Sequence, residues 1–243
     1  MSFLRVENLS KTYQLRKAFG GRSKEQVHAV DNVSFEVQKG ETLGIVGESG
    51  CGKSTLGRTI VRLEEPTSGR IFFDEEELTS KSQSQLRVVR KKIQMIFQDP
   101  YASLNPRRPI GKIVEEPMRV HGIGREERRE IALSLLAKVG LDRDAYEKYP
   151  HQFSGGQRQR VVIARALSLN PTLVVADEPV SALDVSIQAQ VLNLFKDLQR
   201  ELGLTYLFIA HDLGVVRHVS DRIAVMYLGK IVEMADAQSL YLQ

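Results

Sequence analysis

Residues 47–54 read Gly47-Glu48-Ser49-Gly50-Cys51-Gly52-Lys53-Ser54, a match to the pattern G-x-x-x-x-G-K-[ST]. Glycines allow successive backbone N–H groups to converge on phosphate oxygens, because no Cβ stands in the way. A helix expected from Gly52 onward adds the positive end of its dipole. In this pattern Lys53 reaches the β- and γ-phosphates of a nucleotide, the Ser54 hydroxyl holds Mg²⁺, and Thr55 is placed to bond an α-phosphate oxygen.

The residues on either side of this loop supply the strand and the helix that it requires. Leu43–Val46 is a short apolar run typical of a buried strand, and Leu56–Val61 continues as a helix. The alternative is a glycine-rich turn before an ordinary helix, which would not require a buried strand directly before the glycines. Cys51 is expected to contribute its backbone N–H, and a reactive thiol fits less well. The sequence therefore predicts an ATP·Mg²⁺ site whose loop residues are Gly47, Ser49, Gly50, Cys51, Gly52, Lys53, Ser54 and Thr55.

A second motif, Leu173–Glu178, is an apolar run that ends in two acids. Carboxylates at the C-terminal edge of a buried parallel strand lie where nucleotides bind in α/β sheets. Asp177 is therefore the candidate Mg²⁺ ligand. Glu178 is the candidate base that polarises the attacking water.

The rest of the chain alternates between apolar strand patterns and amphipathic helix patterns. The expected strands are 3–6, 33–37, 42–46, 70–73, 93–97, 173–176, 205–210 and 223–227. The expected helices are 52–61, 110–120, 125–139, 155–169, 186–201 and 213–219. Residues 15–26 are polar and indicate a surface loop or hairpin. This alternation predicts a largely parallel sheet covered by helices. The core is expected to span 1–97 and 160–243, with a helical subdomain inserted at 98–159.

Bulk composition is that of an ordinary globular protein: 243 residues, 42% hydrophobic and 26% charged. The net charge of +4 is scattered along the chain, which does not favour a nucleic-acid partner. A single cysteine, Cys51, excludes an internal disulfide and a cysteine-rich metal site. The first ten residues lack the pattern of a secretory signal. No apolar run approaches the roughly 18 to 20 residues that span a bilayer, so a membrane role is expected only through a partner.

Residues 153–157, Phe-Ser-Gly-Gly-Gln, open a helix with a glycine-rich, polar turn, for which simple N-capping by Ser154 is the alternative interpretation. Together with the two motifs above, this turn closely resembles the signature of ATP-binding cassette (ABC) ATPases, with Phe153 in place of the usual leucine. The resemblance spans essentially the whole chain. It implies a P-loop NTPase (RecA-like) parallel-sheet core with an antiparallel β subdomain and an inserted α-helical subdomain.

The same resemblance implies roles for further residues. Tyr13 looks like the aromatic on which adenine stacks, with a buried core tyrosine as the alternative. Gln98 matches the glutamine that senses Mg²⁺ and water, and His211 matches the histidine that contacts the γ-phosphate. Asp184 closes the Ser181-Ala182-Leu183-Asp184 loop, which crosses between subunits. The residues of a second subunit that complete each ATP site are implied to be Ser154, Gly155, Gly156 and Gln157.

Residues 98–107 and 180–190 look like those of the ATPases of peptide and nickel importers, and the insertion near 19–23 leans toward the oligopeptide/dipeptide branch. The partners implied are a second ATPase subunit, identical or different, and a membrane permease held through residues 99–120. A substrate-binding protein is an indirect partner, and the expected location is peripheral, on the cytoplasmic face of the membrane. That branch usually continues with a proline- and histidine-containing tail, so a chain ending at Gln243 is expected to be shortened.

Four alternatives stay open on the sequence. One is a nickel importer ATPase. The second is a soluble ABC ATPase acting on DNA or ribosomes, although such proteins usually insert coiled coils or fuse two cassettes. The third is a P-loop switch protein or kinase, in which the signature and His211 have no role. The last is a partner subunit that binds ATP without cleaving it, against which Glu178, His211 and the intact signature argue.

Overall fold

The computed structural model describes residues 2–16 and 22–239. They form two compact units: residues up to Arg90 with those from Thr205 onward, and Lys91–Leu204. Each unit is described by itself. The insertion expected near 19–23 lies partly outside the described residues, since 19–21 are not among them.

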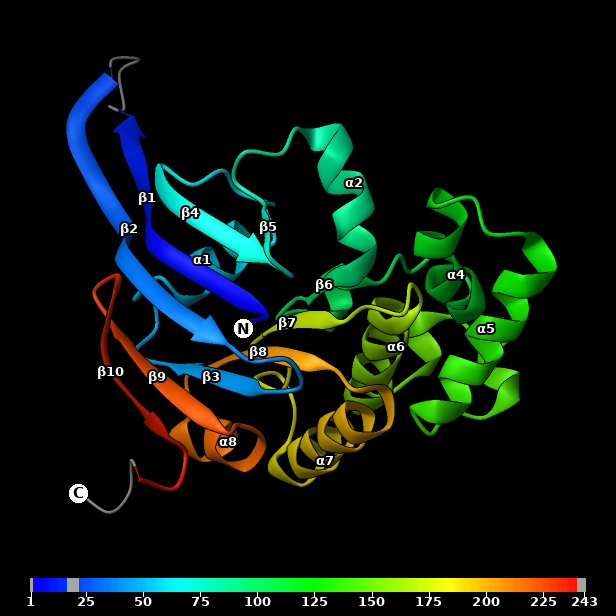
Figure 1. Cartoon of the computed structure of the whole chain (residues 1–243). Helices are drawn as coiled ribbons and strands as arrows, with labels where there is room; N and C mark the ends of the chain where they lie inside the picture. The colour runs from blue at the N-terminus through cyan, green and yellow to red at the C-terminus, as the bar shows by residue number, and fades with distance from the viewer. Residues whose placement is uncertain (1, 17–21, 240–243) are drawn as a thin grey trace. The chain divides into compact units, whose positions relative to one another are not determined.

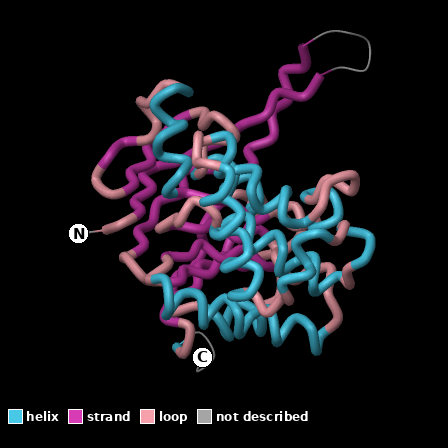
Figure 2. The backbone as a smooth tube through the Cα atoms, turned by 90° about the vertical axis from the view of Figure 1, so that its right-hand side faces the viewer, coloured by secondary structure: helices cyan, strands magenta, loops and turns pink. Residues whose placement is uncertain are grey.

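An antiparallel sheet opens the first unit. Its strands are β1 (Leu4–Arg16), β2 (Arg22–Val37), β4 (Ser68–Phe73) and β5 (Glu76–Glu77), in the order β2-β1-β4-β5. Figure 2 shows β1 and β2 running side by side as one long hairpin. The expected strands at 3–6 and 33–37 cover only one end of each of these two strands. The backbones at Asn8 and Asn32 have positive φ and the register shifts along the hairpin, which interrupts the alternation that would have marked the full strands.

A second set of strands in this unit carries the predicted loop. These are β3 (Thr42–Val46), β8 (Thr205–Ala210), β9 (Arg222–Tyr227) and β10 (Lys230–Asp236). Strand β3 pairs in parallel with both β8 and β9, and β10 pairs antiparallel with β9. All residues of β3 and β8 are buried, which explains their continuous apolar runs. The helices are α1 (Lys53–Ile60), α8 (Leu213–Val219) and α2 (Gln83–Lys92), which begins in this unit.

Two parallel strands and a group of helices make up the second unit. Strand β6 (Ile93–Ile96) pairs with β7 (Leu173–Asp177). Figure 1 shows α4, α5 and α6 gathered beside one another. The helices are α3 (Pro100–Ser103), α4 (Ile110–Val120), α5 (Arg125–Lys138), η1 (Arg143–Glu147), η2 (Pro150–Gln152), α6 (Gly155–Leu167) and α7 (Val185–Leu202). The inserted helical subdomain with limits at 98 and 159 stays a prediction.

A buried carboxylate ties three of these helices together. Glu115 of α4 is 3% exposed and accepts hydrogen bonds from Lys112 and from the hydroxyl of Tyr146 in η1. Its Oε2 also lies 3.6 Å from Nε of Arg128 in α5. Burial by itself would raise the pKa of Glu115, but the hydrogen bonds from Tyr146 and Lys112 and the nearby positive charges together lower it. Gly111 admits the Tyr146 ring, because a Cβ there would lie 2.2 Å from Cδ2 of Tyr146.

Glu115→Gln should therefore destabilise the protein in a pH-dependent way. At neutral pH we expect a loss of about 1–3 kcal/mol in the free energy of unfolding, since two cations lose their counter-charge. A carboxyl whose pKa is lowered by folding stabilises the protein above its ordinary value of 4.5, and that stabilisation disappears as the pH falls. The difference from wild type should shrink below that pH in urea titrations. Glu147→Gln, at a 72% exposed side chain, is the control. A difference that does not vary with pH would contradict this.

Candidate functional site

The loop Gly47–Ser54 is enclosed by backbone from two other strands. A Cβ on Gly47 would lie 2.1 Å from the carbonyl oxygen of Met226 in β9, and one on Gly52 would lie 1.9 Å from the carbonyl oxygen of Ala29 in β2. Gly52 also has φ +107, which side chains rarely adopt. Gly47 and Gly52 are thus required by close backbone approach from neighbouring strands, whereas the convergence of the loop's N–H groups on phosphate stays a prediction.

Gly52→Ala should disrupt the loop even without nucleotide. The new methyl group would meet a backbone oxygen in a left-handed conformation, so we expect the free energy of unfolding to fall by about 2–4 kcal/mol. Chemical denaturation measures this. Gly124→Ala is a matched control, because nothing lies within 4 Å of a Cβ built on Gly124. Equal stability of the Gly52→Ala and Gly124→Ala proteins would show that the loop is not confined in this way.

Lys53 and the start of α1 give the loop its positive character. Lys53 is only 4% exposed, and its Nζ donates to the carbonyls of Gly47 and Glu48 at 2.8 Å each. Helix α1 begins after Gly52, which has no side chain to cap it. The N–H groups of a first helical turn lack partners inside the helix, which makes such an end suitable for anions. A buried ammonium beside an uncapped helix start is a site for phosphate.

The register of the parallel strands places His211 at the same edge as the loop. Val46, the last residue of β3, pairs with Ala210, the last residue of β8. Gly47 and His211 follow directly, at the carboxyl ends of adjacent strands, where ligands bind in such sheets. The His211 side chain is exposed. The structure therefore brings the loop and His211 together on one edge, as the proposed contact with a γ-phosphate requires.

Tyr13 stands on β1 and is 37% exposed, so the alternative of a tyrosine buried in the core is wrong. Its hydroxyl donates to Glu64, and the Nζ of Lys11 lies 5.0 Å from the ring centroid. Burial, followed by the hydrogen bond to Glu64, raises the pKa of Tyr13, while a hydrogen bond with Thr55 opposes this. The hydroxyl of Tyr13 therefore lies near Thr55, the residue that follows the phosphate loop. Sequence patterns did not single out Lys11 or Glu64 as functional residues.

In the second unit, the acidic motif meets Gln98. Strands β6 and β7 pair at Ile96 and Ala176, so Gln98 and Glu178 follow in register, and Gln98 Nε2 donates to Glu178 Oε2 at 2.9 Å. Glu178 has φ 47, a left-handed backbone that is costly for a side-chain-bearing residue and is found at functional sites. Asp177 is 1% exposed. The arrangement suits a carboxylate held to orient water. The expectation that both acids lie beside the phosphate loop stays a prediction.

The predicted signature forms the start of α6. Ser154 caps the helix in a reciprocal arrangement: its Oγ accepts from the N–H of Gln157, whose Oε1 accepts from the N–H of Ser154. The N-capping interpretation is thus correct for the isolated chain, and both side chains are exposed. A Cβ on Gly156 would lie 2.4 Å from Cγ2 of Ile187, and one on Gly155 would lie 3.4 Å from Leu183. Asp184 is exposed and precedes α7.

The residues predicted to bind magnesium carry donor atoms of the right kind. Ser54 of the first unit, and Gln98 and Asp177 of the second, each offer an oxygen atom, which Mg²⁺ prefers; that they share one ion stays a prediction. Among the described residues, no group of three or more His, Cys, Asp or Glu residues could hold a metal ion. Mg²⁺ commonly binds through one or two carboxylates and the phosphates of its substrate, so a single Asp177 is sufficient.

Known proteins that are similar to this chain in sequence and structure agree with a nucleotide site. No helix in the described residues is long and apolar enough to span a bilayer. "Oligopeptide transport ATP-binding protein AppF" of Bacillus subtilis is 56% identical over 99% of this chain and 74% of its own length. "Dipeptide transport ATP-binding protein DppF" of Escherichia coli is 51% identical over 98% and 71%.

A solved structure is similar over nearly all of the chain. It is the dimeric ATP-binding cassette MJ0796 in a post-hydrolysis state bound to ADP and Pi, with a TM-score of 0.84 and 33% identity over 96% of this chain and 98% of that one. The family model described as ABC transporter matches residues 30–181. The chain therefore belongs to the ABC transporter family.

Proposed function

We propose that this chain is the ATP-hydrolysing subunit of an ABC importer for dipeptides or oligopeptides. The observation that carries the proposal is the enclosed phosphate loop with its buried Lys53, in a chain 56% identical to an oligopeptide transport ATP-binding protein. The other relatives quoted above support the peptide class. The alternative is the ATPase subunit of a nickel importer, which would also hydrolyse ATP.

The proposed reaction is ATP + H₂O → ADP + phosphate. Lys53 turns from the carbonyls of Gly47 and Glu48 to the β- and γ-phosphates, while the N–H groups of the loop hold the remaining oxygens. Glu178, oriented by Gln98, accepts the proton of the attacking water. His211 donates a hydrogen bond to the γ-phosphate. Ser54, Gln98 and Asp177 would hold Mg²⁺, which would neutralise charge on the phosphates.

We propose further that each ATP site is completed by a second ATPase subunit. Exposed Ser154 and Gln157 at the start of α6 are groups that a facing subunit would direct at the γ-phosphate. Asp184, followed by Val185 with an 81% exposed side chain, is the segment proposed to cross to the partner. The dimeric state of the similar cassette MJ0796 supports this arrangement. Binding of ATP would close the dimer and hydrolysis would reopen it.

The permease partner is proposed to bind residues 99–120, on the cytoplasmic face of the cell membrane. Tyr101 is 58% exposed, and the guanidinium of Arg158 lies 4.2 Å from its ring centroid. Such an exposed aromatic with a stacked arginine is typical of protein interfaces. A substrate-binding protein outside the membrane would deliver the peptide.

Transport in vesicles tests the proposal. The chain, reconstituted with its permease and partner ATPase, should drive uptake of a labelled dipeptide or oligopeptide by the binding protein, and only with ATP. Uptake of Ni²⁺ in place of peptide would select the nickel alternative. Turnover that rises with DNA or ribosomes and drives no uptake would select a soluble ABC ATPase instead.

A further inference from the structure

Tyr13 is held at both its hydroxyl and its ring. The hydroxyl donates to Oε2 of Glu64, whose Oε1 lies 3.9 Å from Nη1 of Arg58 in α1. The Lys11 ammonium occupies one face of the ring. The residue opposite Tyr13 on β2 is Val27, which is 46% exposed, so the two side chains share one face of the hairpin. A base stacking on Tyr13 would use the ring face that Lys11 does not occupy.

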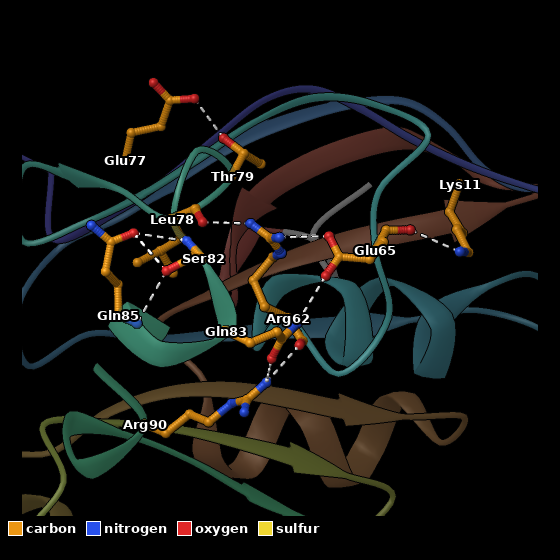
Figure 3. Close-up of polar contacts among 10 residues, drawn as sticks. All are labelled: Lys11, Arg62, Glu65, Glu77, Leu78, Thr79, Ser82, Gln83, Gln85 and Arg90. Carbon is orange, nitrogen blue, oxygen red and sulfur yellow. Dashed lines mark hydrogen bonds and ion pairs between the residues drawn. The ribbon is translucent and has the colours of Figure 1, made fainter. Parts of the chain in front are cut away.

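The turn that presents Glu64 is fixed by a buried arginine (Figure 3). Arg62 is 5% exposed, and its guanidinium donates to the carboxylate of Glu65 at 2.5 Å and to the carbonyl of Leu78. The ammonium of Lys11 donates to the carbonyl of Glu65 at 2.7 Å, and Arg90 donates to the carbonyl of Arg62 at 3.1 Å. The short turn Arg62–Glu65 thus includes Glu64, which binds the hydroxyl of Tyr13. It also binds Lys11, whose ammonium lies over the ring of Tyr13.

The backbone of Arg62 indicates that these contacts determine the turn. Its φ of 56° is left-handed, a conformation that is unfavourable for a residue with a side chain. Glycine is the usual residue at such a helix end. The N–H of Arg62 still donates to Thr59, and that of Leu63 to Arg58, which terminates α1. The helix that begins at the phosphate loop therefore ends in the turn that holds Tyr13.

We propose that Glu64 and Arg62 are positioning residues for the nucleotide base, acting through Tyr13. Glu64 fixes the hydroxyl of Tyr13, and Arg62 fixes the turn that carries Glu64. The inference rests on the proposed function, since it presumes that the base stacks on Tyr13. Losing either anchor frees the ring and weakens binding of the base, whereas the phosphate contacts of Lys53 and the hydrolytic step persist.

Steady-state kinetics of the assembled transporter test this, with inorganic tripolyphosphate as a competitor that has phosphates but no base. Glu64→Ala, which removes the acceptor of the Tyr13 hydroxyl, should raise KM for ATP about 3- to 10-fold, with kcat and the inhibition constant of tripolyphosphate unchanged. GTP should show the same rise, because stacking uses the face that all bases have. Arg62→Gly, which suits the left-handed backbone, should likewise raise KM for ATP and leave kcat and the inhibition constant of tripolyphosphate unchanged. Glu233→Ala, at an exposed carboxylate of β10, is the control.

A double-mutant cycle isolates the contact. Tyr13→Phe should raise KM as Glu64→Ala does, and combining the two should add nothing, because both remove the hydrogen bond between the Tyr13 hydroxyl and Glu64. Additive effects, or an equal shift in the inhibition constant of tripolyphosphate, would overturn the positioning role. If Tyr13→Ala raises KM and Glu64→Ala does not, only the positioning role fails. If tripolyphosphate does not compete with ATP on the wild type, the proposed nucleotide site is itself wrong.

Discussion

Glu178→Gln should keep ATP binding and nearly abolish turnover. Glutamine has the same shape, and its side-chain oxygen still accepts the hydrogen bond that Gln98 donates at 2.9 Å. It cannot accept a proton from the attacking water, so we expect phosphate release to fall about 10²- to 10⁴-fold. The affinity for ATP should stay within about twofold of wild type. Phosphate release and ATP titration on the same preparation measure both quantities.

Glu130→Gln is the matched control for this prediction. Glu130 is an exposed carboxylate of α5, in the same unit of the protein, and its replacement changes the net charge equally. Turnover of the Glu130→Gln protein should equal that of wild type. Near-normal phosphate release by the Glu178→Gln protein would remove Glu178 from the role of base.

Lys53→Ala should lose most of the affinity for ATP. The lysine is the buried cation of the loop, and its Nζ already lies within 2.8 Å of the carbonyls of Gly47 and Glu48. Removing a desolvated charge that would bond the β- and γ-phosphates should weaken binding about 10²-fold or more. Calorimetric titration with ATP measures the loss. Affinity for tripolyphosphate should fall by the same factor, because the lysine acts on the phosphates alone.

Lys39→Ala controls for the loss of one positive charge. Lys39 is exposed in the turn before β3, at the end of that strand opposite the loop. The Lys39→Ala protein should bind ATP with the same affinity as wild type. Unchanged ATP affinity of a folded Lys53→Ala protein would mean that the loop Gly47–Ser54 is not the phosphate site.

Much of the fold was predictable where strands are buried and helices amphipathic. The bounds of β3 and β8, and those of α4 and α8, agree with the sequence prediction because their apolar patterns are local and unbroken. Helix α2 was not predicted, since only Leu86 of its residues is buried and no apolar stripe marks it. Strand β10 was missed for a similar reason: none of its residues is buried.

The candidate site was likewise predictable only where its residues are neighbours in the sequence. The phosphate loop is contained in eight consecutive residues, so its pattern is visible in the sequence alone. The contact between Gln98 and Glu178 joins positions 80 apart and was not predicted, although each residue was singled out for a role of its own. The anchor of Tyr13 joins positions 51 apart and depends on a left-handed turn at Arg62, a residue type that gives no sign of that conformation. Long-range polar contacts of this kind need the folded backbone to become visible.

The central claim is that Gly47–Ser54 is half of an ATP site that a second subunit completes. The molar mass of the Glu178→Gln protein in solution, measured by light scattering with its partner ATPase subunit present, tests it most directly. We expect single subunits without nucleotide or with ADP, and a species of two subunits when Mg·ATP is added. Separate single subunits at saturating ATP, together with wild-type turnover per molecule that does not depend on protein concentration, would contradict the claim.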